Sequence, residues 1–113
     1  MNVKDVVAPI PVRSFGSTAL DANIWQPVGD VFDHALFYIH ILNDCDVDVE
    51  ISFNGTDIHM FIPTGLDREV YFQNGAMPNN QRAVLAAGTT VYVRGIPGAA
   101  GFVVVSGFYN RPA

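Results

Sequence analysis

An alternating row of acidic side chains is the first candidate for chemistry in this sequence: Asp44, Asp46, Asp48 and Glu50. Several neighbouring carboxylates suggest calcium, because hard cations bind such oxygen ligands. An EF-hand loop needs glycine at its sixth position, however, and counting from Asp44 places Val49 there. Carboxylates two residues apart on a strand also lie about 7 Å apart along the backbone, too far for a tight cage. We therefore interpret the row as a solvated face that protects a strand edge, and we expect no bound metal.

The three histidines, His34, His40 and His59, are the second candidate, because three imidazoles with one open position make a hydrolytic zinc site. Their spacing matches none of the usual ligand motifs. His34 opens a predicted strand, His40 alternates with apolar residues, and His59 belongs to an acidic hairpin. An enzyme of the cupin type would need all three to converge, and the sequence does not predict that they do.

Nucleophilic catalysis has no recognisable motif in this chain. No Gly-x-Ser-x-Gly elbow occurs, and no serine has an obvious base beside it. The serines are Ser14, Ser17, Ser52 and Ser106. We therefore expect a protein that is not an enzyme, with no catalytic residues and no cofactor.

Exposed aromatic side chains could bind sugars, since a flat ring stacks on a pyranose while nearby carboxylates bind its hydroxyls. Tyr71 and Tyr92 do alternate with polar neighbours. Aromatic residues are nevertheless enriched in strands because they pack well on a pleated surface, and they also dominate protein interfaces. Packing in a core or an interface is therefore the preferred interpretation of the four candidates, which are Trp25, Tyr71, Tyr92 and Tyr109.

The stretch DVEISFNGTDIHMFIP, residues 48–63, predicts a β-hairpin. Asn54-Gly55 favours a two-residue turn, because both central residues of that turn need positive φ. In this register Glu50 lies opposite His59, so a cross-strand charge pair explains the histidine without catalysis. Alternation then gives one polar face and one apolar face, the latter formed by Val47, Val49, Ile51, Phe53, Ile58, Met60 and Ile62.

Length and composition indicate one small domain with an unusual amount of apolar surface. The chain has 113 residues, of which 50% are apolar and 15% charged, so some apolar surface is expected to meet other subunits. The net charge is −5 and basic residues do not cluster, which argues against nucleic acid as a partner. A single cysteine, Cys45, is expected to be reduced and packed. No apolar run has the length of a signal peptide or a membrane helix, so we expect synthesis in the cytoplasm and no membrane partner.

Short β-branched and aromatic runs separated by Gly, Pro, Asn and Asp recur along the chain, whereas no helical period persists. The prediction is an all-β fold, an antiparallel β-sandwich or jelly-roll-like arrangement of eight or nine short strands. The predicted strands are 17–20, 23–28, 35–42, 46–53, 57–62, 69–73, 82–86, 90–94 and 102–109.

The amino-terminal residues 1–16 differ from the remaining sandwich domain, residues 17–113. Pro9 and Pro11 lie in the run VVAPIPVRSF. Because proline removes a ladder donor and restricts the residue before it, we expect an extended arm without regular pairing. Such an arm is predicted to lie across an adjacent subunit of a closed homo-oligomer.

Two of the predicted strands, ALFYIHIL at 35–42 and FVVVSGFY at 102–109, are apolar on both faces. A sandwich core can bury only one face of each strand, and large exposed apolar patches are rare on soluble monomers. The other face and the arm are therefore predicted to form protein interfaces. The candidate interface residues are Val7, Pro9, Ile10, Pro11, Val12, Phe15, Leu36, Tyr38, Val103, Val105 and Tyr109.

Four segments together resemble small all-β virion proteins of tailed bacteriophages: STALDANIWQPV, LFYIHILNDCDVDVEISFNGTDIHMFIP, LAAGTTVYVRG and GFVVVSGFY. The shared features are an Ile-Ser-Phe-Asn-Gly hairpin, a Gly-Thr-x-Val-Tyr-Val strand and a final Gly-rich strand, over about residues 17–109. The resemblance implies a structural role in a capsid decoration, collar or tail-adaptor component, with other virion proteins as partners and the virion as location. It implies no catalytic residues. The alternative is a carbohydrate-binding module that uses Trp25 or the strand tyrosines.

Overall fold

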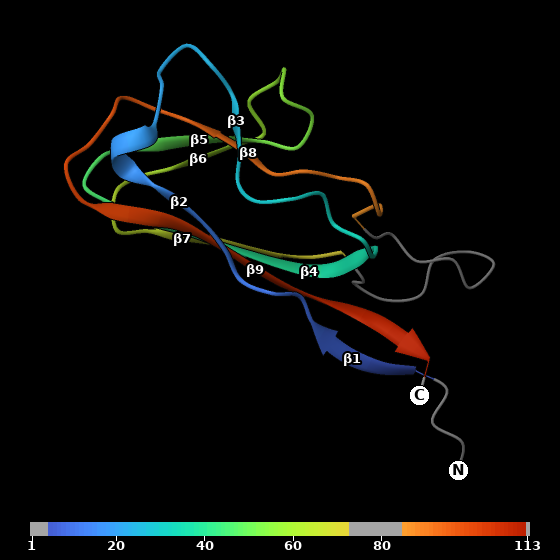
Figure 1. Ribbon diagram of the computed structural model, residues 1–113. Coiled ribbons are helices and arrows are strands. Elements are labelled where there is room, and N and C mark those ends of the chain that lie inside the picture. Colours follow the sequence, from blue (N-terminus) through green and yellow to red (C-terminus); the bar gives the residue numbers. More distant parts are fainter. Residues whose placement is uncertain (1–4, 73–84, 113) are drawn as a thin grey trace.

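The chain folds as an all-β sandwich, which confirms the fold class expected from the sequence (Figure 1). The computed structural model describes residues 5–72 and 85–112. Within these ranges nine strands form two antiparallel sheets, and the only helical element is the short 3-10 helix η1 (Ser17–Ala19). No helix in the same ranges is long and apolar enough to cross a membrane.

The two sheets lie face to face. The central strands of the first sheet are β9 (Gly101–Pro112) and β4 (Leu36–Cys45); β9 pairs with β1 (Asp5–Pro9) and β2 (Arg13–Gly16), and β4 pairs with β7 (Asp67–Tyr71). The second sheet has the order β3 (Gln26–Pro27), β8 (Tyr92–Arg94), β5 (Val49–Ser52) and β6 (Met60–Ile62). Figure 1 shows the sheets as two layers, with β1 and the end of β9 projecting beyond the sandwich.

One of the two apolar faces of β9 fills the core and the other lies on the surface. Val103 and Val105 are fully buried between the sheets, whereas Phe102 and Phe108 point outward and are exposed. The expectation that Val103 and Val105 face a partner is therefore corrected, because they are the core face of the strand. The residues that fill the core are Ile10, Leu20, Val28, Phe32, Leu36, Ile39, Ile41, Cys45, Val49, Ile51, Ile62, Val91, Val93, Val103 and Val105.

A β-bulge in β4 explains a second correction. The pairing of β4 with β9 shifts between Leu36 and Tyr38, so strict alternation fails at this point. Leu36 and Ile39 consequently both point inward and are fully buried. Leu36, predicted to be an interface residue, is part of the core, while Tyr38 lies on the outer face.

The amino-terminal segment pairs regularly with the chain's own sheet, so the expectation of an unpaired arm is wrong for its described part. β1 pairs with residues 108–112 of β9, and β2 pairs with residues 102–105. Proline is tolerated here because Pro9 ends an outer strand and Pro11 lies in the break between β1 and β2. Within that break Ile10 donates its backbone N–H to the Gly107 carbonyl at 3.0 Å and is buried, so Ile10 belongs to the core as well.

The predicted hairpin exists, but its register and turn differ from the prediction. Glu50 pairs with Phe61 rather than His59, a shift of two residues along one strand. Because side chains alternate with a period of two, this shift leaves the strand residues Val49, Ile51 and Ile62 on the predicted apolar face. These three residues are accordingly buried together. Ile58, also predicted on that face, lies instead in the loop and is 51% exposed.

Side-chain hydrogen bonds organise a longer loop, residues 53–59, in place of the two-residue turn. Asn54 Oδ1 accepts bonds from the N–H groups of Thr56 and Asp57, both at 2.9 Å, and Ser52 Oγ accepts one from Gly55 N–H at 2.9 Å. Gly55 has φ +74°. The two residues that we predicted to shape the turn, Asn54 and Gly55, therefore do shape it, through an Asx-type turn rather than a tight hairpin turn.

Three other predicted strands differ from the observed elements. Of residues 17–20, expected as a strand, the first three form the helix η1, and the Ser17 carbonyl accepts bonds from Leu20 and Gly98 N–H. The strand expected at 23–28 shortens to β3. Most of the strand expected at 82–86 lies outside the described residues, although Leu85 forms an isolated bridge with Leu36.

Candidate functional site

Two members of the acidic row, Asp46 and Asp48, bind backbone N–H groups of two different loops. Asp46 accepts bonds from Ala99 N–H at 2.9 and 3.1 Å, and this backbone bond holds the pKa of the Asp46 carboxyl below its usual value. Asp48 Oδ1 accepts a bond from Thr64 N–H at 2.9 Å. Each carboxylate therefore anchors a different loop. No group of three or more His, Cys, Asp or Glu side chains in the described residues could hold a metal ion.

The three histidines lie in separate surroundings, so the structure does not bring them together as a triad. His34 stacks on Tyr109 with ring centroids 3.8 Å apart. His40 Nε2 lies 2.7 Å from Asp67 Oδ2 on the outer face of the first sheet. His59 Nδ1 accepts a bond from Phe53 N–H at 2.9 Å within the hairpin loop.

Cysteine and two of the serines are parts of the packing. Cys45 is buried, and this burial raises the pKa of its thiol. Ser17 Oγ donates to Asp46 Oδ1 at 3.0 Å, and Ser52 Oγ donates to Asn54 Oδ1 at 3.0 Å. Both hydroxyls therefore fix loops.

The aromatic residues considered for sugar binding do not share one platform. Trp25 lies under the Arg94 guanidinium, 4.3 Å from its ring centroid, on the second sheet. Arg94 Nε also donates to Glu50 Oε1 at 2.8 Å. Tyr109 stacks on His34, and Tyr92 of β8 is half-buried. Of the four candidates, Tyr71 is the most exposed, with 54% of its surface in solvent on the outer face of the first sheet.

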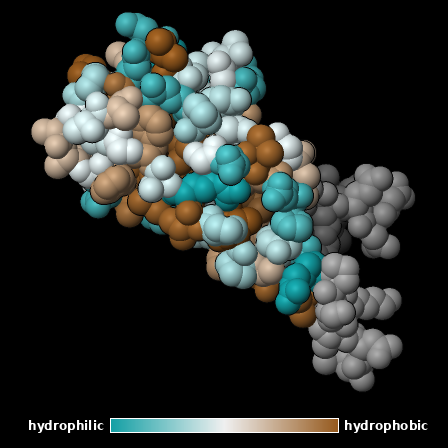
Figure 2. Space-filling view, in the orientation of Figure 1, coloured by the Kyte–Doolittle hydropathy of each residue, from teal (hydrophilic) through white to brown (hydrophobic). Residues whose placement is uncertain are grey.

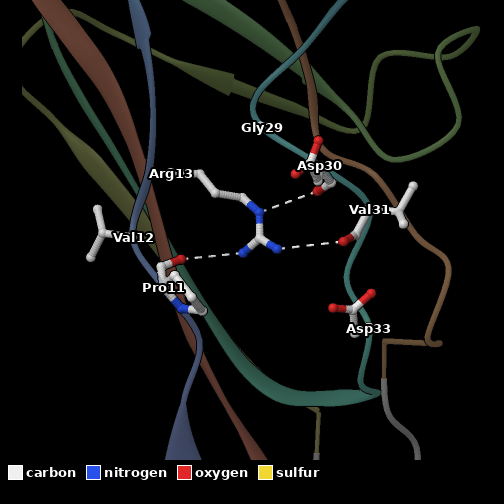
Figure 3. A pocket seen from close by; sticks show the side chains of 7 residues that line it. All are labelled: Pro11, Val12, Arg13, Gly29, Asp30, Val31 and Asp33. Atoms are coloured by element: carbon white, nitrogen blue, oxygen red, sulfur yellow. Dashed lines mark hydrogen bonds between the residues drawn. The ribbon is translucent and has the colours of Figure 1, made fainter.

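A surface hollow of about 780 Å³ surrounds Arg13 (Figure 3). Arg13 donates to the backbone carbonyls of Pro11, Asp30 and Val31 at 3.2–3.4 Å, and its guanidinium lies 4.7 Å from the Phe32 ring centroid. Figure 3 shows all three bonds converging from two segments of the chain. Because its donors are already used in this way, Arg13 joins β2 to the loop between β3 and β4, and we do not regard this hollow as the functional site.

A second hollow lies on the outer face of the first sheet, and we call it the aromatic groove. It is an open groove of about 340 Å³ lined by Val7, Phe37, Tyr38, Tyr71 and Phe108. Tyr38 is central, with ring centroids 4.6 Å from Tyr71 and 5.8 Å from Phe108. Three different strands, β4, β7 and β9, position these rings, and β1 adds Val7, which is 60% exposed. Unlike the Arg13 hollow, the groove is mainly apolar.

Carboxylates border the aromatic groove along β7. The Tyr38 hydroxyl donates to Glu69 Oε2 at 2.8 Å, and this bond raises the pKa of Tyr38 to about 12, with burial as a lesser cause. Asp67 lies one step further along the same face, beside His40. An acidic rim next to exposed aromatic rings distinguishes this groove from an ordinary apolar patch.

The sequence predicted only part of this groove. Val7 and Tyr38 were among the predicted interface residues, and Tyr71 was considered as a sugar-binding aromatic. Phe108 was missed because the face of β9 that carries it was expected in the core, and Phe37 was missed because it lies at the β-bulge of β4. The remaining predicted interface residues lie elsewhere: Pro9, Pro11 and Val12 are exposed, and Phe15 and Tyr109 are half-buried against the core.

Comparison with known proteins adds no identification, since no protein-family model and no curated protein matches this chain.

Proposed function

We propose that the chain is a structural subunit of a tailed-phage virion that binds neighbouring virion proteins through the outer face of its first sheet. The observation that carries this proposal is the aromatic groove, where apolar side chains from four strands meet in solvent. Contiguous exposed apolar patches of this kind mark interaction sites. The resemblance of the four sequence segments to phage virion proteins supports the virion as the setting.

The low charged fraction of the sequence, 15%, supports a homo-oligomer within the proposed assembly. Val12, Ile24, Ile96 and Phe102 are each more than half exposed and lie outside the groove. Figure 2 shows hydrophobic residues scattered among hydrophilic ones over the visible face, not confined to one patch. Because such scattered apolar residues are common on monomers, the proposed symmetric homo-oligomer rests on the low charged fraction and not on this distribution.

Carbohydrate binding is the second candidate function, favoured by one observation. Tyr71 is exposed close to the Glu69 carboxylate, and an aromatic ring beside a carboxylate is the combination that binds a sugar ring and its hydroxyls. A glycan array separates the candidates: binding of defined glycans that is lost in Tyr71→Ala would favour the carbohydrate-binding module.

The virion proposal is tested by comparing two variants during particle assembly. Tyr71→Asp places a charge in the groove, whereas Ile58→Asp places the same charge at a similarly exposed apolar residue of the hairpin loop. Purified virions of the source phage should contain the unaltered chain and Ile58→Asp in a fixed ratio to the major virion proteins, and should lack Tyr71→Asp. Absence of the unaltered chain from purified virions would refute the proposal.

A further inference from the structure

We infer that the aromatic groove binds an arginine side chain from a neighbouring protein. This inference rests on the proposed function, because it specifies the chemistry of the partner that the outer face receives. It comes from three features of the groove: the arrangement of its rings, the sign of the charge around it, and the occupation of the chain's own basic residues.

The rings form a cleft rather than a flat platform. The plane of Tyr38 is tilted by 48° from that of Tyr71 and by 43° from that of Phe108. A pyranose stacks best on one flat ring face, whereas a planar guanidinium can lie against one ring of a cleft. The aliphatic stem of arginine would then pack on apolar residues such as Val7.

Within the described part of the chain, this outer face carries Asp and Glu side chains but no Lys or Arg. His40 also lies on it, paired with Asp67. The pairing of β4 with β7 sets Glu69 opposite His40 and Asp67 opposite Leu42, on the face that carries Tyr38. Asp44, further along β4, is exposed on the same face. Arg68, between Asp67 and Glu69, points to the other side of β7 and donates to the Phe61 carbonyl at 3.2 Å. The face therefore attracts a cationic partner.

Glu69 is positioned to receive such a cation. The Tyr38 hydroxyl holds one carboxylate oxygen, Oε2, at 2.8 Å, which fixes the carboxylate next to the rings. No basic side chain forms an ion pair with Glu69 among residues 5–72 and 85–112. Guanidinium pairs with a carboxylate through paired N–H donors while its face contacts an aromatic ring, and lysine lacks this geometry.

The charge on the face also argues against a second copy of the chain as the occupant. Two outer faces in contact would bring acidic residues against acidic residues. Of the four arginines in the described residues, Arg13 and Arg68 donate to backbone carbonyls and Arg94 donates to Glu50. Arg111 is exposed near the end of β9, where it is set opposite Val6 of β1. We therefore infer a different protein as the occupant, one that presents arginine on an exposed segment, and a second copy that presents Arg111 is the alternative tested below by light scattering.

The test is an NMR titration of the intact protein with N-acetyl-arginine amide, independent of any virion preparation. We expect saturable shifts of the Tyr38, Tyr71 and Phe108 ring resonances in the millimolar range, and none of Trp25 on the opposite sheet. Glu69→Gln should weaken binding about fivefold or more, because it removes the charge that pairs with the guanidinium. Asp44→Asn is the matched control and should leave binding unchanged. It removes the same charge from the same face, but Asp44 lies about 20 Å from Tyr38 along β4.

Parallel titrations separate the competing occupants. N-acetyl-lysine amide should bind more weakly than the arginine compound, and N-acetyl-alanine amide should not bind. Three results would each overturn the inference: no ring shifts with the arginine compound, equal binding by Glu69→Gln, or stronger shifts with methyl glucoside or methyl galactoside. Light scattering that shows a dimer abolished by Tyr71→Asp would assign the groove to a second copy. A negative titration combined with the presence of the chain in virions would refute only the arginine inference, whereas absence from virions would refute the proposed function.

Discussion

Asn43 offers the most demanding test of how the two sheets are joined. Its side chain is fully buried, and Nδ2 donates to the carbonyls of Val47 and Ile62, both at 2.9 Å. Oδ1 accepts a bond from Cys45 N–H at 3.0 Å. Ile62 belongs to β6 of the second sheet, whereas Asn43 belongs to β4 of the first. One amide therefore connects the sheets and also shapes the chain that leaves β4.

Asn43→Ala should destabilise the protein strongly. The substitution leaves two backbone carbonyls and one N–H without their partner, and each unsatisfied buried group costs about 1–3 kcal/mol. Taking the lower part of that range for each group, the free energy of unfolding should fall by about 3–5 kcal/mol. Domains of this size have a total stability of about 5–15 kcal/mol, so the variant would be marginal, with a melting temperature lower by roughly 15 °C or more.

Urea unfolding followed by circular dichroism measures this loss. Asn110→Ala, at an exposed position of β9, is the matched control and should change the free energy of unfolding by less than about 0.5 kcal/mol. Asn43→Asp should also destabilise, because a carboxylate keeps the acceptor but loses both donated bonds and buries a charge. A loss below about 1 kcal/mol for Asn43→Ala would refute the reasoning, because it would mean that the three groups need no side-chain partner.

Three further predictions concern the loop and the two carboxyl groups with structural bonds. Gly55→Ala should lower the free energy of unfolding by about 1 kcal/mol in thermal denaturation, because alanine must adopt the positive φ of this residue; an unchanged melting temperature would contradict the loop geometry. In ultraviolet titration Glu69→Gln should lower the pKa of Tyr38 from about 12, because the charged acceptor that stabilises the neutral phenol is lost; an unchanged alkaline titration would show that the bond does not form in solution. The pKa of Asp46 is lowered in the folded protein, so its stabilising effect is present above the ordinary aspartate pKa near 4 and is lost as the pH falls through the folded value. The difference in free energy of unfolding between wild type and Asp46→Asn should therefore be larger at pH 7 than at pH 3, and a difference independent of pH would contradict this assignment.

Short-range patterns predicted the fold class and the faces of the hairpin, because alternation depends only on neighbouring residues. Val49, Ile51 and Ile62 share the buried face even though the register differs by two residues. The loop between them was not predictable from Asn54-Gly55 alone, since Ser52 and Asn54 side chains satisfy the backbone of a longer turn. The strand predicted at 17–20 was wrong for a similar reason. The buried Ser17 binds Asp46 and Gly98, which are distant in the sequence.

The aromatic groove depends on pairings that are distant in the sequence, so its composition could be predicted only in part. Tyr38 and Tyr71 become neighbours because β4 pairs with β7, and Phe108 joins them because β4 also pairs with β9. A bulge beside Leu36 decides which of its neighbours faces outward, and no residue type in this stretch signals a bulge. The pairing of β1 with β9 adds Val7, although the two prolines of this segment argued against any pairing.

The central claim is that the outer face of the first sheet binds a neighbouring virion protein. An electron cryomicroscopy reconstruction of a virion shown to contain this chain tests the proposal most directly, because it places every subunit beside its neighbours. We expect Tyr71 and Phe108 to be covered by another protein, with an arginine of that protein beside Glu69. A reconstruction in which the chain occupies the virion with its aromatic groove open to solvent would contradict the proposed role of this outer face.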